Sequence, residues 1–136
     1  MTGTVLDASV IVELLIVSPL GRRVAGELPS RRAGGLHIPH LAVVETASVL
    51  RGLVLGSRVA TDRAEGALAD LAVLPCTRWP VEGLLPRLWQ LRDNLTAYDA
   101  TYVALAEALD AELVTADRRL ARAAADVATC PITLVA

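Results

Sequence analysis

The sequence comprises 136 residues and 14.3 kDa with a formal net charge of −2, a length that suits one domain able to bury its own core. Hydrophobic residues make up 54% of it and charged residues 21%, so intrinsic disorder is excluded and we expect one domain over residues 1–136. It contains no stretch of about 18 uncharged apolar residues and no basic leader, which predicts a cytoplasmic protein that does not enter the membrane.

Short apolar runs alternate with longer helical patterns along the chain. In order, we predict a strand at 4–6, helices at 10–16 and 18–28, a strand at 36–38, helices at 41–55 and 61–74, an ambiguous segment at 73–78 that we interpret as a strand, helices at 81–91 and 96–109, a strand at 112–115, a helix at 118–125 and a strand at 132–135. Strands of this kind indicate a parallel sheet covered on both faces. The expected fold is therefore α/β, with three α/β/α layers around a central parallel sheet of about four to five strands.

Four acidic residues occupy positions that core packing alone does not explain. Asp7 and Asp117 each follow an apolar strand closely, at the carboxyl edge where parallel sheets form their sites. Glu45 is the only charged residue between positions 41 and 50, and Asp99 lies in the first turn of an apolar helix. We therefore expect the four carboxylates to share one pocket.

Each of these acids also has a purely structural interpretation. Asp7 and Asp117 are favoured types of helix N-cap, and Asp99 lies three residues after Thr96, as in a capping box. Glu45 could lie on a hydrated helix face. A shared cluster is the simpler account, because two acids stand at strand ends and the other two lie on helices that can pack beside those ends.

A cluster of carboxylates needs a counter-charge, because like charges a few ångströms apart destabilise one another. Oxygen ligands favour Mg²⁺ or Mn²⁺ over zinc, and such an ion can activate water and neutralise charge on a phosphodiester. All 13 basic residues are arginine, and the lack of lysine excludes a P-loop and Schiff-base catalysis. The residues therefore predict a metal ion held by carboxylates, with hydrolysis by activated water.

Four stretches of the sequence resemble the PIN-domain ribonucleases, and closely the VapC toxins of type II toxin–antitoxin systems. They are residues 5–9 (VLDAS), 39–45 (PHLAVVE), 95–106 (LTAYDATYVALA) and 113–120 (LVTADRRL). The resemblance runs from the start of the chain to its end, although residues 58–92 match no motif. It implies a PIN-like fold and an Mg²⁺-dependent endoribonuclease that hydrolyses RNA phosphodiester bonds.

The resemblance also assigns roles to individual residues. The family's four acidic positions, catalytic and metal-binding, are here Asp7, Glu45, Asp99 and Asp117. Asp7 and Asp99 are implied as the most direct ligands, whereas Glu45 and Asp117 would act through water or at a second ion. Ser9 and Thr115 stand at supporting hydroxyl positions that orient the ligands or contact the phosphate.

RNA binding has to be reconciled with the negative net charge. With the four acids of the proposed site set aside, the remaining residues carry a net charge of +2. Arg118 and Arg119 directly follow Asp117 and are our candidates for phosphate contacts, with Arg92 as a further one. The charge distribution is therefore compatible with an RNA substrate.

The family implies two protein partners, a cognate VapB-like antitoxin that blocks the acidic site and a second copy of the chain in a homodimer. An alternative function is a non-catalytic PIN-like module that holds RNA or protein. A small Mg²⁺-dependent phosphatase is disfavoured because such enzymes use a lysine beside their aspartates. The RNA target, the antitoxin's identity and the number of ions are left open by the sequence.

Overall fold

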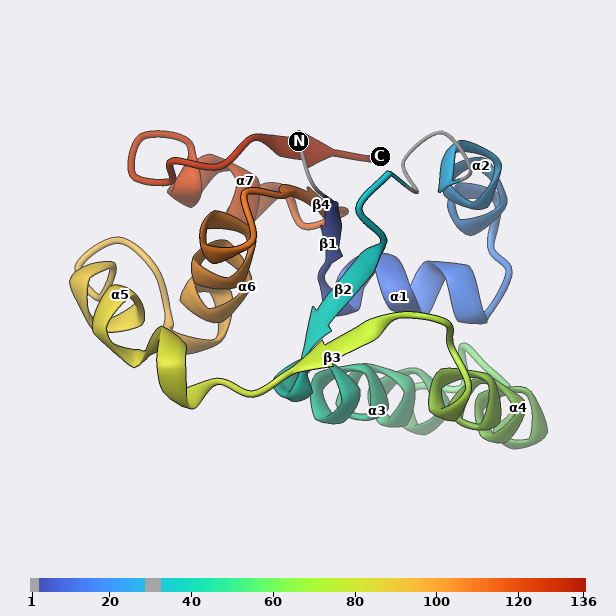
Figure 1. Ribbon diagram of the computed structural model, residues 1–136. Coiled ribbons are helices and arrows are strands. Elements are labelled where there is room, and N and C mark those ends of the chain that lie inside the picture. Colours follow the sequence, from blue (N-terminus) through green and yellow to red (C-terminus); the bar gives the residue numbers. More distant parts are fainter. Residues whose placement is uncertain (1–2, 29–32) are drawn as a thin grey trace.

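The computed structural model describes residues 3–28 and 33–136, which form a parallel β-sheet flanked by helices (Figure 1). The strands are β1 (Thr4–Leu6), β2 (Leu36–Pro39), β3 (Thr77–Trp79), β4 (Glu112–Thr115) and β5 (Ile132–Leu134), in the spatial order β3-β2-β1-β4-β5. In the middle strand, Val5 pairs with His37 on one side and with Leu113 on the other. The five strands confirm the predicted α/β fold.

The helices form the two outer layers. On one side of the sheet lie α1 (Ala8–Leu15), α2 (Pro19–Glu27), α3 (His40–Leu55) and α4 (Thr61–Ala72), and on the other lie the 3-10 turn η2 (Glu82–Leu84), α5 (Leu85–Gln90), α6 (Ala97–Ala108) and α7 (Arg118–Ala124) (Figure 1). Right-handed crossovers require this division. The connections from β1 to β2 and β3 run across the sheet in one direction, whereas those from β3 to β4 and from β4 to β5 run in the opposite direction, so their helices lie on opposite faces.

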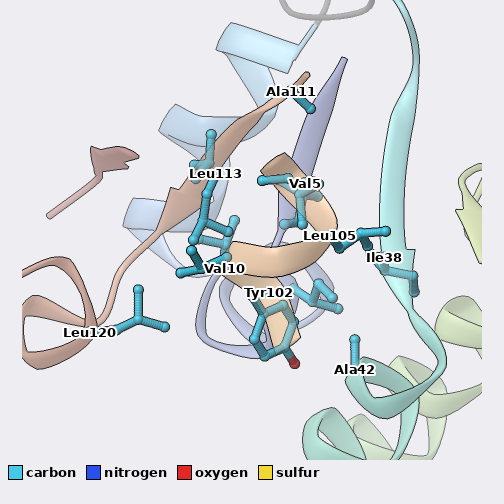
Figure 2. Close-up of a cluster of buried hydrophobic side chains, with 14 of the residues drawn as sticks. Val5, Val10, Ile38, Ala42, Tyr102, Leu105, Ala111, Leu113 and Leu120 are labelled. Carbon is cyan, nitrogen blue, oxygen red and sulfur yellow. The ribbon is translucent and has the colours of Figure 1, made fainter. Parts of the chain in front are cut away.

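The core is formed by apolar side chains from the central strands and from α6. Val5, Leu6 and Leu113 are fully buried, and every residue of α6 from Ala100 to Ala106 is buried. This stretch contains mainly alanine, leucine and valine, which suits a helix packed against both the sheet and α5. Figure 2 shows part of this cluster, with Val5, Tyr102, Leu105 and Leu113 among its labelled side chains.

The direction of strand order reverses between β1 and β4. The chain leaves β1 toward β2 and β3, and later continues from β4 to β5 on the opposite side. At such a reversal the segments after the two strands separate, and a crevice opens at their carboxyl ends. Asp7 follows β1 directly and Asp117 follows β4 after one residue, so the fold places both at this crevice.

Two predicted elements differ from the structure. The predicted strand at 73–78 begins only at Thr77, because α4 continues to Ala72 and Val73 is its C-cap. The predicted helix at 81–91 is divided into η2 and α5, because Pro86 has no backbone N–H and is tolerated only at the start of a helix. Within the described residues, no helix is long and apolar enough to span a membrane.

Candidate active site

A cavity of about 360 Å³ opens at the carboxyl ends of β1 and β4. Five carboxylates line it, and four of them, Asp7, Glu45, Asp99 and Asp117, come from four separate segments. The other polar side chains in its wall belong to Ser9, Glu13, Tyr102 and Arg119. Segments that lie up to 110 positions apart in the sequence therefore bring their acids to one hollow.

Asp7 is the most deeply placed of the four acids, with only 4% of its surface exposed. Its Oδ1 accepts hydrogen bonds from the Ser9 hydroxyl at 2.5 Å and from the backbone N–H of Val10 at 3.2 Å, and the second of these caps α1. Its Oδ2 accepts a hydrogen bond from the Thr115 hydroxyl at 2.5 Å. Asp7 is therefore both a helix cap and a wall of the cavity.

The two hydroxyls that bind Asp7 are themselves oriented by the backbone after β4. Ser9 Oγ accepts the N–H of Ala116 at 2.9 Å, and Thr115 Oγ1 accepts the N–H of Asp117 at 2.9 Å. With these lone pairs used, each hydroxyl directs its hydrogen toward Asp7. Of the two roles that the resemblance implied, this geometry favours orientation of the carboxylate over contact with phosphate.

Asp117 and Asp99 lie at the mouth of the cavity on two helix N-termini. Asp117 caps α7 through Oδ1, which accepts the N–H groups of Arg119 at 2.9 Å and Leu120 at 3.2 Å. In α6 the cap is Thr96, whose hydroxyl accepts the N–H of Asp99 at 3.1 Å. The Asp99 side chain remains 15% exposed, and each helix therefore holds a carboxylate at the rim.

A single arginine lies between these two rim acids. Arg119 Nη2 is 3.8 Å from Asp99 Oδ2 and 3.8 Å from Asp117 Oδ2, while 73% of the Arg119 side chain is exposed. Ion pairs as exposed as these contribute little to stability, so the guanidinium is free to turn toward a ligand. Arg118 does not line the cavity, and Arg92 lies over the Trp89 ring at 4.9 Å.

Glu45 projects from α3 and meets a residue that the sequence analysis did not assign to the site. The hydroxyl of Tyr102 donates a hydrogen bond to Glu45 Oε1 at 2.6 Å. Tyr102 lies one turn after Asp99 on α6, a spacing of three residues that places both on the same face. That spacing was the available signal, but it does not identify Glu45 as the partner.

The acids that line the cavity outnumber its one lining arginine, Arg119, so their negative charge is only partly compensated. Burial raises the pKa of Asp7, and the nearby charge of Asp117 raises it further against the hydrogen bonds that lower it. Burial also raises the pKa of Glu45, with additional contributions from Asp99 and Asp7. The pKa of Asp99 is raised by burial and by Asp117, although Arg119 opposes this.

The carboxylates of the cavity do not converge tightly enough to form a set of metal ligands. Within residues 3–28 and 33–136, no three acids, histidines or cysteines form a group compact enough to hold an ion. The Ser9 and Thr115 hydroxyls hold Asp7 and the Tyr102 hydroxyl holds Glu45, whereas Asp99 and Asp117 share Arg119. In type and number the donors fit a hard divalent cation, which prefers oxygen ligands and would relieve the repulsion that raises their pKa values.

Comparisons with known proteins place the chain in a family. The model of the PIN domain matches residues 4–126. The chain belongs to the PIN domain family. It is 44% identical over 131 residues to a VapC ribonuclease of Mycobacterium bovis, covering 96% of this chain and 97% of that one. It is also 39% identical over 136 residues to the ribonuclease VapC1 of Mycobacterium tuberculosis, covering 99% of both, so within the PIN domain family it belongs with the VapC ribonucleases.

Solved structures agree on the fold. FitAcB of Neisseria gonorrhoeae superposes with a TM-score of 0.69 at 20% identity, covering 95% of each chain. PAE2754 of Pyrobaculum aerophilum gives a TM-score of 0.68 at 23% identity, covering 96% of this chain and 83% of that one. These likenesses confirm the PIN-like arrangement of the sheet and helices.

The raised pKa of Asp7 predicts how stability depends on pH without metal. A carboxyl whose pKa is higher in the folded than in the unfolded state binds more protons when folded, so stability falls as pH rises through that interval. In EDTA, the melting temperature of the wild type should therefore fall relative to that of Asp7→Asn between about pH 4 and pH 7.

The comparison with a variant is needed because other carboxyls act in the opposite direction. Burial would raise the pKa of Glu107, but hydrogen bonds from Arg87 hold this pKa below its usual value. The stability that Glu107 contributes to the fold is therefore lost as the pH falls. Taking the difference between the two proteins at each pH removes this common contribution. If the melting temperatures of the wild type and Asp7→Asn differed by the same amount at every pH, this would contradict a buried, destabilised carboxylate at Asp7.

Proposed function

We propose that this VapC-family chain is the toxin of a toxin–antitoxin pair and an endoribonuclease that hydrolyses RNA phosphodiester bonds with a divalent metal ion. The observation that carries the proposal is that four carboxylates from four segments line the wall of one cavity. Such a cluster costs stability unless it serves a cation. Membership of the family indicates the reaction, and the acidic cavity is the candidate site for it.

The four acids would have different roles in binding the ion, which is Mg²⁺ or Mn²⁺. Asp7 and Asp99 are the proposed direct ligands, while Glu45 and Asp117 act through water or at a second ion. When bound, the ion would lower the pKa of a water molecule and neutralise charge on the scissile phosphodiester. Ser9 and Thr115 hold the Asp7 carboxylate in place, and their donated hydrogens favour its ionised form.

Arg119 is the proposed contact for the RNA phosphate. Arg119→Ala should raise the KM for RNA about tenfold and reduce the salt dependence of RNA binding by roughly one counterion, because one phosphate contact is lost. The matched control is Arg122→Ala, an exposed arginine on the same helix that does not line the cavity. Equal salt slopes for wild type and Arg119→Ala would remove Arg119 from the interface and leave Arg118 or Arg92 as candidates.

The proposed protein partners are an antitoxin that enters the acidic cavity and a second copy of the chain. The open negative cavity is a suitable receptor for a basic side chain of an antitoxin. Apolar side chains exposed on α3, among them Val44 and Leu55 with 69% and 67% of their surface exposed, offer area for protein contacts. Because the substrate is RNA, we place the activity in the cytoplasm.

The test is cleavage of RNA by the purified chain, freed of antitoxin. Incubation with total cellular RNA and Mn²⁺ should produce discrete new ends, which sequencing will locate. Asp7→Asn, prepared in the same way, controls for contaminating nucleases and should produce none. Ends that appear equally with both proteins, or with neither, would favour the non-catalytic binding module.

A further inference from the structure

Helix α6 carries a second polar group toward the cavity besides Asp99. The ring of Tyr102 is packed among the buried side chains of the core, and only 2% of the residue is exposed. Figure 2 shows its oxygen directed out of the cluster, on the side where Ala42 of α3 lies. Tyr102 is thus a core residue whose polar tip reaches the wall of the acidic cavity.

That tip makes the single hydrogen bond that holds the Glu45 carboxylate among the described residues. The Tyr102 hydroxyl donates to Glu45 Oε1 at 2.6 Å and joins α6 to α3 across 57 positions of sequence. A glutamate side chain has three torsions, so fixing it in one orientation costs conformational entropy. Without the bond, Glu45 could turn away from the acidic cavity toward the adjoining hollow that it lines together with Val44 and Ser48.

A phenol is well suited to hold a carboxylate that must also bind a cation. A guanidinium at this place would neutralise Glu45 and compete with the ion for it. The Tyr102 hydroxyl is neutral, so Glu45 keeps its full negative charge and its second oxygen. The ring is fixed by core packing and has only two torsions, so the donor is already in place before an ion arrives.

We propose that Tyr102 is a positioning residue that holds Glu45 at the cavity, so that part of the cation site is built in the absence of the ion. The inference rests on the proposed function, because it assumes that the acidic cavity binds a divalent cation. Tyr102 acts only through Glu45 and touches neither the ion nor RNA. Groups that orient a metal ligand typically contribute about 10- to 100-fold to metal affinity or activity.

The test measures Mn²⁺ affinity by electron paramagnetic resonance of the free ion, independently of RNA. Tyr102→Phe keeps the buried ring and removes the hydroxyl, and should weaken Mn²⁺ binding about tenfold. Glu45→Asp keeps the charge but withdraws the carboxylate from the Tyr102 hydroxyl, and should cause a similar loss even if Tyr102→Phe folds poorly. The matched control is Tyr98→Phe. Tyr98 is on the same helix and is 59% exposed, so this variant should bind Mn²⁺ like the wild type.

A double-mutant cycle separates positioning from a structural effect. In a Glu45→Gln background, Tyr102→Phe should cause no further loss of Mn²⁺ affinity, because the residue through which it acts has been removed. A further tenfold loss in that background, or wild-type affinity of the single variant, would overturn the proposal. Failure of the proposed function gives a different result, namely that the wild-type protein itself binds no Mn²⁺.

Discussion

Asp99→Asn is expected to lower RNA cleavage roughly 100- to 1000-fold. A bound metal ion contributes several kcal/mol to transition-state stabilisation, and each 1.36 kcal/mol corresponds to about tenfold in rate. Asp99 lines the cavity together with Asp7, and asparagine has the same size but no charge to hold a cation. The measurement is the cleavage rate of a defined RNA at saturating Mg²⁺.

The same variant should not lose stability, and this separates a site residue from a structural one. Burial and the charge of Asp117 raise the pKa of Asp99, so its ionised form is unfavourable in the metal-free fold. In EDTA at neutral pH, Asp99→Asn should melt at or above the wild-type temperature. Asp93→Asn, an exposed acid outside the cavity, should cleave RNA like the wild type. Cleavage by folded Asp99→Asn within threefold of the wild type would refute a role for Asp99.

The sheet was predictable because its strands are short apolar runs that end at polar residues. Residues 4–6 and 112–115 are all buried, and the apolar pairs Val5–Leu6 and Leu113–Val114 within them indicated the strands that the structure has at both places. The segment at 73–78 was harder, because β3 is an edge strand of three residues that are not fully buried. Periodicity is informative only where a face or a whole strand is buried.

The two interpretations of the acids were not alternatives. Asp7 and Asp117 are helix caps, and both also line the cavity. A parallel strand followed by a helix places the N-cap at the carboxyl edge of the sheet, where ligands bind. One position therefore serves both purposes, because Asp117 caps with Oδ1 and keeps Oδ2 toward the rim.

The pairings of side chains across the cavity could not be read from the sequence. The Thr115 hydroxyl meets Asp7 across 108 positions, and this depends on the register of β4 beside β1. Tyr102 meets Glu45 only because α6 and α3 approach each other at one end of the sheet. For the same reason the sequence could not separate Arg119, which lines the cavity, from Arg118, which does not. Adjacent residues on a helix point about 100° apart, and the orientation of α7 decides which faces the acids.

Divalent metal should both stabilise the protein and be required for its activity. Removing Mg²⁺ with EDTA should stop RNA cleavage, and adding Mg²⁺ or Mn²⁺ should restore it. At an ion concentration 100 times the dissociation constant, binding to the folded state alone adds about 2.7 kcal/mol, which corresponds to roughly 10 °C in the melting temperature of a chain of this size. Calorimetry with and without Mn²⁺ measures this shift.

The stabilisation should depend on the acids and on pH together. Protons compete with the ion for carboxylates whose pKa values are raised, as burial raises that of Asp7, so the shift should be smaller at pH 5 than at pH 7.5. It should also be largely lost in Asp99→Asn and unchanged in Asp93→Asn. Because the four acids come together only in the folded chain, binding of the ion contributes directly to the free energy of folding. A melting temperature that does not respond to Mn²⁺ at any pH would mean that these four carboxylates do not form a metal site.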